Sequence, residues 1–145
     1  MAPVVVYLTG YRQHAGKTVT SLGIISQLRR VLDVSKIGYI KPVGQEMTSV
    51  HDGDQVDKDV KLLSVFSSLP GFEPGHLSPV RFTPGFTRNY LESGDQKALT
   101  RTLQRRILES LKSLEDKQVI IAEGSGHPGV GAIAGLSNAD VGNLL

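Results

Sequence analysis

The sequence predicts an α/β fold with a doubly wound, mostly parallel sheet, and three observations lead to this prediction. Apolar runs and helical patterns alternate along the 145 residues, as they do where helices connect parallel strands. Residues 119–122 form a continuous apolar run, which is typical of a central strand covered on both faces. A glycine-bearing turn over residues 10–16 joins the first apolar run to the first helical pattern.

In the first half of the chain we expect two strands and two helices. Residues 3–9 are predicted as a buried strand because they are mostly apolar. A helix is expected over residues 16–31, where apolar residues recur at helical spacing: Leu22, Ile25, Leu28 and Leu32. Residues 37–40 are predicted as a short strand that ends at Lys41-Pro42, and residues 56–66 have a helical pattern.

The second half begins with residues 67–94, which are rich in proline and glycine and contain one expected short strand over residues 80–82. Residues 117–123 are the last clear strand. Before it we expect a long helix with one apolar face, formed by Leu99, Leu103, Ile107, Leu111 and Leu114.

A helix N-cap and first turn are expected at residues 137–140, Ser-Asn-Ala-Asp. The sequence stops at Leu145, barely two turns into that helix. A doubly wound sheet normally continues with further strands that cover such a helix. We therefore expect residues 1–145 to be the N-terminal portion of a longer domain.

Composition excludes several classes of protein. With 39% hydrophobic and 21% charged residues, the chain fits one ordinary globular domain. No apolar stretch approaches the roughly 18 residues of a membrane span and no leader precedes the first strand, so we expect a cytoplasmic protein without a membrane partner. A net charge of +2 argues against nucleic acid. The absence of cysteine excludes disulfides, thiolate metal sites and a cysteine nucleophile.

Residues 10–18, Gly-Tyr-Arg-Gln-His-Ala-Gly-Lys-Thr, have the composition and position of a phosphate-binding loop. A glycine-bearing turn that opens a helix offers backbone N–H groups and the positive end of the helix dipole. Gly16 lets the backbone approach the phosphates, Lys17 would reach the β and γ oxygens, and Thr18 would offer its hydroxyl to Mg²⁺. Five residues separate the first glycine from Gly-Lys-Thr, one more than usual. The alternative is a glycine-rich turn that only looks like a nucleotide site.

Charged residues follow two further strands. Lys41 comes directly after residues 37–40, and Glu123 ends the strand of residues 117–123. The carboxyl ends of parallel strands meet at one edge of a sheet, where ligands bind, so both residues should emerge beside residues 10–18. A carboxylate at such a strand end commonly coordinates Mg²⁺.

Other polar residues allow two interpretations. Three acids precede the second helical pattern, where they are helix caps or metal ligands: Asp54, Asp57 and Asp59. His127, four residues after Glu123, is either catalytic or a loop histidine in contact with backbone or solvent. One interpretation of His14 is a contact with phosphate or ribose from inside the loop, and the other is a loop residue without such a contact. His51 and His76 have no metal-site spacing.

Three segments carry a family resemblance: the long-spaced loop of residues 10–18, Gly-Tyr-Ile-Lys-Pro-Val at residues 38–43, and Ala-Glu-Gly-Ser-Gly at residues 122–126. Together they resemble the dethiobiotin synthetase-like family of P-loop proteins. Its relatives include cobyrinic acid a,c-diamide synthases and the N-terminal domain of some phosphate acetyltransferases. The resemblance extends over nearly the whole chain and implies a P-loop NTPase fold, with residues 1–145 as a nucleotide-binding domain.

The resemblance also implies roles for individual residues. Lys17 and Lys41 would be catalytic, because they would stabilise the γ-phosphoryl group of ATP during its transfer. The implied Mg²⁺ ligands are Thr18, Asp59 and Glu123, with Asp57 as the alternative to Asp59. The implied nucleotide contacts are Gly10, Gln13, His14, Ala15, Gly16, Lys17, Thr18 and Val19.

In the family reaction, ATP phosphorylates a carbamate made from a diamine and CO₂, and the neighbouring amine then closes a ring and expels phosphate. The resemblance therefore implies an ATP- and Mg²⁺-dependent ligase of the dethiobiotin synthetase type, as in biotin biosynthesis. It would act as a homodimer on a small-molecule carboxylate or amine substrate.

Three alternatives to the ligase hypothesis remain. Arg12 and His14 replace acids of the dethiobiotin synthetases, which favours a nucleotide-sensing regulatory domain like that attached to phosphate acetyltransferases. Residues 44–46, Gly-Gln-Glu, are closer to a cobyrinate amidase-like synthase. A partition-type ATPase is disfavoured because Tyr11 stands where such proteins place a signature lysine.

Overall fold

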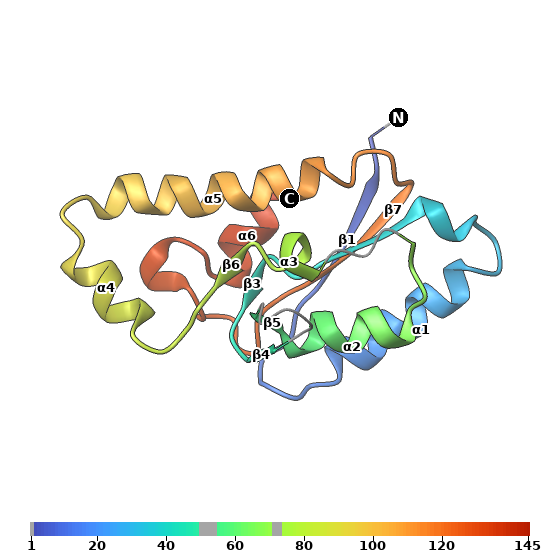
Figure 1. Cartoon of the computed structure of the whole chain (residues 1–145), viewed down its shortest axis with the longest axis horizontal. Coiled ribbons are helices and arrows are strands. Elements are labelled where there is room, and N and C mark those ends of the chain that lie inside the picture. The colour runs from blue at the N-terminus through green and yellow to red at the C-terminus, as the bar shows by residue number, and fades with distance from the viewer. Residues whose placement is uncertain (1, 50–54, 71–73) are drawn as a thin grey trace.

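Three parallel strands form the central sheet of the computed structural model (Figure 1), which describes residues 2–49, 55–70 and 74–145. Strand β7 (Val119–Glu123) lies between β1 (Val4–Leu8) and β2 (Ile37–Ile40). The register pairs Leu8 with Glu123, so β1 and β7 end side by side. Four of the five residues of β7 are buried, which confirms the expected central strand.

Helices cover both faces of this sheet (Figure 1). Helices α1 (Lys17–Leu28) and α2 (Lys58–Phe66) lie on one face, and α5 (Gln96–Lys112) and α6 (Asn138–Leu144) lie on the other. The fold is thus α/β with a parallel sheet, while the complete doubly wound arrangement stays a prediction. No helix in the described part of the chain has the length and apolarity that a membrane span requires.

Smaller elements complete the fold around the central sheet. The parallel pair is β3 (Val43–Gly44) with β6 (Val80–Arg81), and the antiparallel pair is β4 (Met47–Ser49) with β5 (Gln55–Asp57). The short helices are η1 (Val34–Lys36), α3 (Pro74–Leu77), α4 (Phe86–Glu92) and η3 (Ala132–Ala134).

The expected helices agree with the structure except at their ends. The helix predicted over residues 56–66 begins at Lys58, because the carboxylate of Asp57 caps it by accepting the Asp59 N–H at 2.9 Å. Val56 lies instead in β5 and is fully buried. The helix predicted over residues 16–31 ends at Leu28.

The segment of residues 67–94 was expected to contain only a short strand, and this was wrong for α3 and α4. Helix α4 follows Gly85 and is fixed by aromatic packing: the ring of Phe86 lies 4.2 Å from that of Phe82 and 6.3 Å from that of Tyr90, between centroids. These aromatic residues are spaced four apart, a pattern that the prolines and glycines of the segment obscure.

Candidate functional site

The turn between β1 and α1 has the backbone of an anion-binding loop. His14 and Gly16 adopt left-handed conformations, with φ of 56° and 83°, and Gly16 is the N-cap of α1. Turns of this kind direct successive N–H groups to one side, where they form a concavity for anions. The N-terminus of α1 adds the positive end of its dipole. The loop therefore offers both features that a phosphate group requires.

The loop, Lys41 and Glu123 converge on one pocket of about 260 Å³. The parallel sheet accounts for this convergence, since all three follow the carboxyl ends of its strands. The residues proposed from the sequence that line the pocket are Gln13, His14, Ala15, Gly16, Lys17, Thr18, Val19, Lys41, Asp57, Asp59 and Glu123. Gly10 lies behind the loop, where a Cβ would be 3.3 Å from the Cβ of Ala15.

Glu123 is fully buried and hydrogen-bonded at both carboxylate oxygens. Its Oε1 accepts from the Thr18 hydroxyl at 2.7 Å, while Oε2 accepts from the hydroxyls of Ser21 and Tyr39, each at 3.1 Å. Burial raises the pKa of Glu123 above its ordinary value, although Lys41 and the Thr18 bond act in the opposite direction. The contacts to Ser21 and Tyr39 were not predicted, because they depend on the rotation of α1 and on the register of β2 with β7.

Lys41 lies among three carboxylates. Its Nζ is 3.0 Å from Asp57 Oδ1 and 4.0 Å from Glu123 Oε1, and it also pairs with Asp59. The side chain is 7% exposed. Burial alone would lower the pKa of Lys41, but Asp57 and Asp59 outweigh that effect and raise it above the ordinary value. Lys41 is therefore a buried, charged ammonium, and it holds the acids of α2 and β7 together.

Two side chains after β3 close the pocket on its far side. The side-chain Oε1 of Gln45 accepts the Gly126 N–H at 3.0 Å. The backbone N–H of Gln45 donates to Asp57 Oδ2 at 2.9 Å. Glu46 accepts from Gln13 of the loop and pairs with Lys58 of α2. Residues 44–46 stand out in the sequence by their composition, but their place in the site was not predicted.

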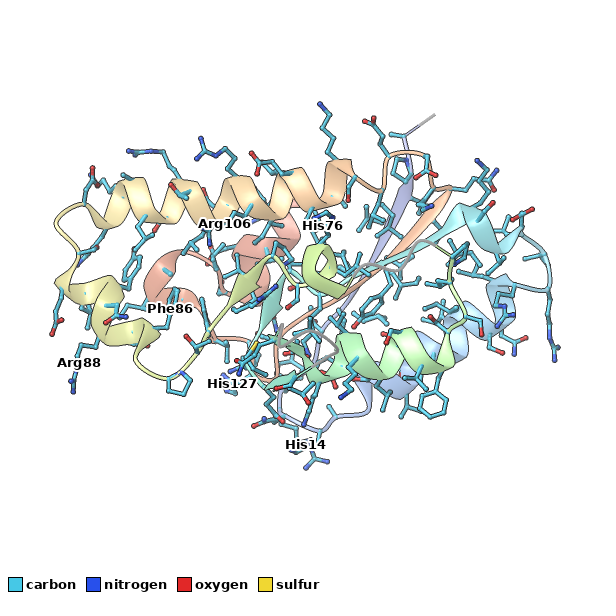
Figure 2. All side chains as sticks on the ribbon, in the orientation of Figure 1. His14, His76, Phe86, Arg88, Arg106 and His127 are labelled. Carbon is cyan, nitrogen blue, oxygen red and sulfur yellow. The ribbon has the colours of Figure 1, made fainter. Side chains whose placement is uncertain are left out.

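The remaining histidines differ in position. Figure 2 shows His14 at the lower tip of the molecule, where it lines the pocket, and His76 near α5, away from the loop. His127 does not line the pocket: its side chain is exposed, and Nδ1 accepts the Gly129 N–H at 3.2 Å. This geometry matches a loop histidine in contact with backbone. Asp54 and His51 lie outside the described residues.

The donor chemistry around Thr18 suits Mg²⁺, which prefers hydroxyl, carboxylate and phosphate oxygens. Thr18 donates its proton to Glu123 and so keeps its oxygen lone pairs for a cation. The ammonium of Lys41 lies between Asp59 and Glu123, so it competes with any cation for those two carboxylates. Within the described ranges, no group of three or more His, Asp or Glu forms a metal site by itself. Such a cation would therefore depend on oxygen ligands from the nucleotide and water.

A parallel sheet whose first strand leads through an anion-binding turn into a helix, with a carboxylate facing the first turn of that helix, defines a P-loop nucleotide-binding domain. Residues 5–145 match the family described as an AAA domain, and the chain belongs to that family. It is a family of P-loop NTPases that includes dethiobiotin synthetase-like members. No curated protein matches the sequence.

Proposed function

We propose that this protein is an ATP- and Mg²⁺-dependent ligase of the dethiobiotin synthetase type. An oxygen of a substrate carboxylate or carbamate attacks the γ-phosphorus, the bond to the β-phosphate oxygen breaks, and ADP leaves. An amine nitrogen then attacks the acyl carbon, a C–N bond forms, and phosphate leaves. The proposal includes a homodimer, which the resemblance implies, and a cytoplasmic location, which is the expectation from the sequence.

The arrangement of Thr18, Lys41 and Glu123 carries this proposal. Phosphoryl transfer needs positioning and positive charge rather than a nucleophilic side chain. Lys17 of the loop and Lys41 after β2 are two cations that line the same pocket. A domain that merely binds nucleotide does not require the second cation to be buried beside the strand-end carboxylate.

Space for an acceptor adjoins the nucleotide pocket. A second hollow of about 610 Å³ shares Gln45 with the first and is walled by the rings of Phe82 and Phe86. None of the described residues that line this hollow is charged. It therefore favours an acceptor whose reactive carboxylate or amine is attached to an uncharged body.

Lys41 also supports a second candidate function, a nucleotide-sensing regulatory domain. Its ammonium is paired with Asp57 and Asp59, and phosphate would have to compete with both acids for it. If these pairs persist with nucleotide bound, Lys41 supports the architecture and not transfer. A sensor binds ATP without producing ADP in any screen of carboxylates and amines.

The first experiment is calorimetric titration with ATP in the presence and absence of Mg²⁺. Lys17→Ala should weaken binding by about 2–4 kcal/mol, because it removes a charge-assisted contact. Lys112→Ala on the exposed side of α5 is the matched control and should bind like the wild type. Equal affinity of wild type and Lys17→Ala would remove the loop from the proposal. ADP release in the substrate screen then separates the ligase from the sensor.

A further inference from the structure

The two oxygens of the Glu123 carboxylate have different surroundings. In the part of the chain that the structure describes, Oε2 accepts from two interior hydroxyls, those of Tyr39 and Ser21, at 3.1 Å each. Oε1 accepts from Thr18 at 2.7 Å and lies 4.0 Å from the Lys41 ammonium, and both of these residues line the pocket. One oxygen is thus directed to the core and the other to the nucleotide site.

The two interior donors come from the elements on either side of Glu123. Tyr39 lies on β2, which pairs with β7, and Ser21 lies on α1, which begins at the loop. Their exposed fractions are 1% and 0%. Hydroxyls this deeply buried cannot exchange their partner for bulk water, and hydrogen bonds to a charged carboxylate are stronger than neutral ones.

These bonds fix a torsion that is otherwise soft. The terminal torsion of a glutamate has broad preferences, so a carboxylate without such donors samples many orientations. Two donors on the same oxygen, from two different elements, hold Glu123 in one orientation. A site that is ordered before its ligand arrives loses less entropy on binding.

We propose that Tyr39 and Ser21 are positioning residues of the nucleotide site. By occupying Oε2 of Glu123, they direct Oε1 to the Thr18 hydroxyl and to the cation that accompanies ATP. The inference rests on the proposed function, since it concerns the Mg²⁺ requirement of that same site. Outer-shell partners of this kind commonly set the metal affinity of a site.

The test is the Mg²⁺ concentration that gives half-maximal enhancement of ATP binding, from calorimetric titrations at a series of Mg²⁺ concentrations. Tyr39→Phe and Ser21→Ala should each raise it roughly tenfold or more, while ATP binding without Mg²⁺ stays unchanged. Tyr90→Phe is the matched control. It removes the same atom from a buried tyrosine whose hydroxyl lies 2.8 Å from Thr100, so its Mg²⁺ requirement should equal that of the wild type.

Urea unfolding of each variant separates positioning from stability. A variant that is less stable but needs no more Mg²⁺ than the wild type overturns the proposal, because a structural role alone would give that result. If Tyr39→Phe does not fold, the smaller change Ser21→Ala decides. A wild type that binds ATP without any effect of Mg²⁺ overturns this inference and leaves the nucleotide site standing. A wild type that binds no ATP overturns the proposed function itself.

Discussion

His14 occupies a backbone conformation that glycine ordinarily fills. Its φ of 56° places it in the left-handed region, which costs most residues about 1–2 kcal/mol but is tolerated by asparagine. We expect His14→Asn to bind ATP like the wild type and His14→Val to bind it more weakly, because the loop would then lose its shape. Calorimetric titration checks both variants. Equal losses in the two variants would instead assign the binding contribution to the imidazole.

Removing the charge of Lys41 should destabilise the protein. Lys41→Met keeps most of the side-chain volume but leaves three acids without their shared counter-ion: Asp57, Asp59 and Glu123. Loss of one partner of a buried pair costs roughly 3 kcal/mol, and urea unfolding at neutral pH measures it. The deficit should shrink in acid as Glu123, whose pKa burial raises, becomes protonated. An unchanged free energy of unfolding would mean that the pairs contribute nothing net.

Lys41→Met should also reduce turnover more than ATP affinity, since positive charge is needed most as charge shifts in the transition state. Comparison of kcat with the calorimetric dissociation constant checks this. Equal losses in both would assign Lys41 to ground-state binding.

Among single residues, the sequence was most informative about those whose position follows from the ends of strands. The loop, Lys41 and Glu123 could be placed together because parallel strands bring their carboxyl ends to one edge. Tyr39 and Ser21 could not, since their contact depends on the register of β2 with β7 and on the rotation of α1. Asp57 is a helix cap, one of the two roles expected for it, and it also forms an ion pair with Lys41 that was not predicted.

Among the helices, α6 has the clearest local sequence signal for where it begins. The Ser137 hydroxyl accepts the Asp140 N–H, and the Asp140 carboxylate accepts the Ser137 N–H, which together form a capping box. Ser137→Ala should lower the free energy of unfolding by about 1 kcal/mol, measured by urea denaturation. Ser26→Ala, at an exposed position inside α1, is the control and should cost nothing. Equal effects would show that the cap is not a source of stability.

The elements that sequence patterns predicted well are those with their own periodicity or cap. Leu103 and Ile107 of α5 are buried as their spacing indicates, and Ser137 begins α6 as expected. Helix α4 was missed because its anchors, Phe86 and Tyr90, sit in a segment whose prolines and glycines dominate the local pattern. The i, i+4 spacing of these two aromatic residues was the available sign.

As pH rises, the affinity of the protein for ATP with Mg²⁺ and its free energy of unfolding should change in opposite directions. Burial raises the pKa of Glu123 above its ordinary 4.5, so the folded chain binds this proton more readily than the unfolded one. The resulting stabilisation is present below that ordinary value and is lost as pH rises through the raised pKa. The wild type should therefore lose free energy of unfolding relative to Glu123→Gln over the range that begins near pH 4.5 and extends upward through the raised pKa.

Urea unfolding of both proteins over that range measures the difference. The affinity for ATP with Mg²⁺ should rise with pH over the same range, because a cation needs the ionised carboxylate. Parallel stability profiles of wild type and Glu123→Gln would contradict the raised pKa. An ATP affinity that is independent of pH would contradict a role for Glu123 in cation binding.

The buried hydrogen bond between Tyr39 and Glu123 also has an optical consequence. The chain contains no tryptophan and four tyrosines, so its ultraviolet-excited emission comes from tyrosine alone. A tyrosine whose hydroxyl donates to a carboxylate fluoresces weakly, because the carboxylate accepts the hydroxyl proton in the excited state. A cation that takes negative charge away from Glu123 should brighten Tyr39. The emission of Tyr39 should therefore report the charge of Glu123, to which its hydroxyl is hydrogen-bonded.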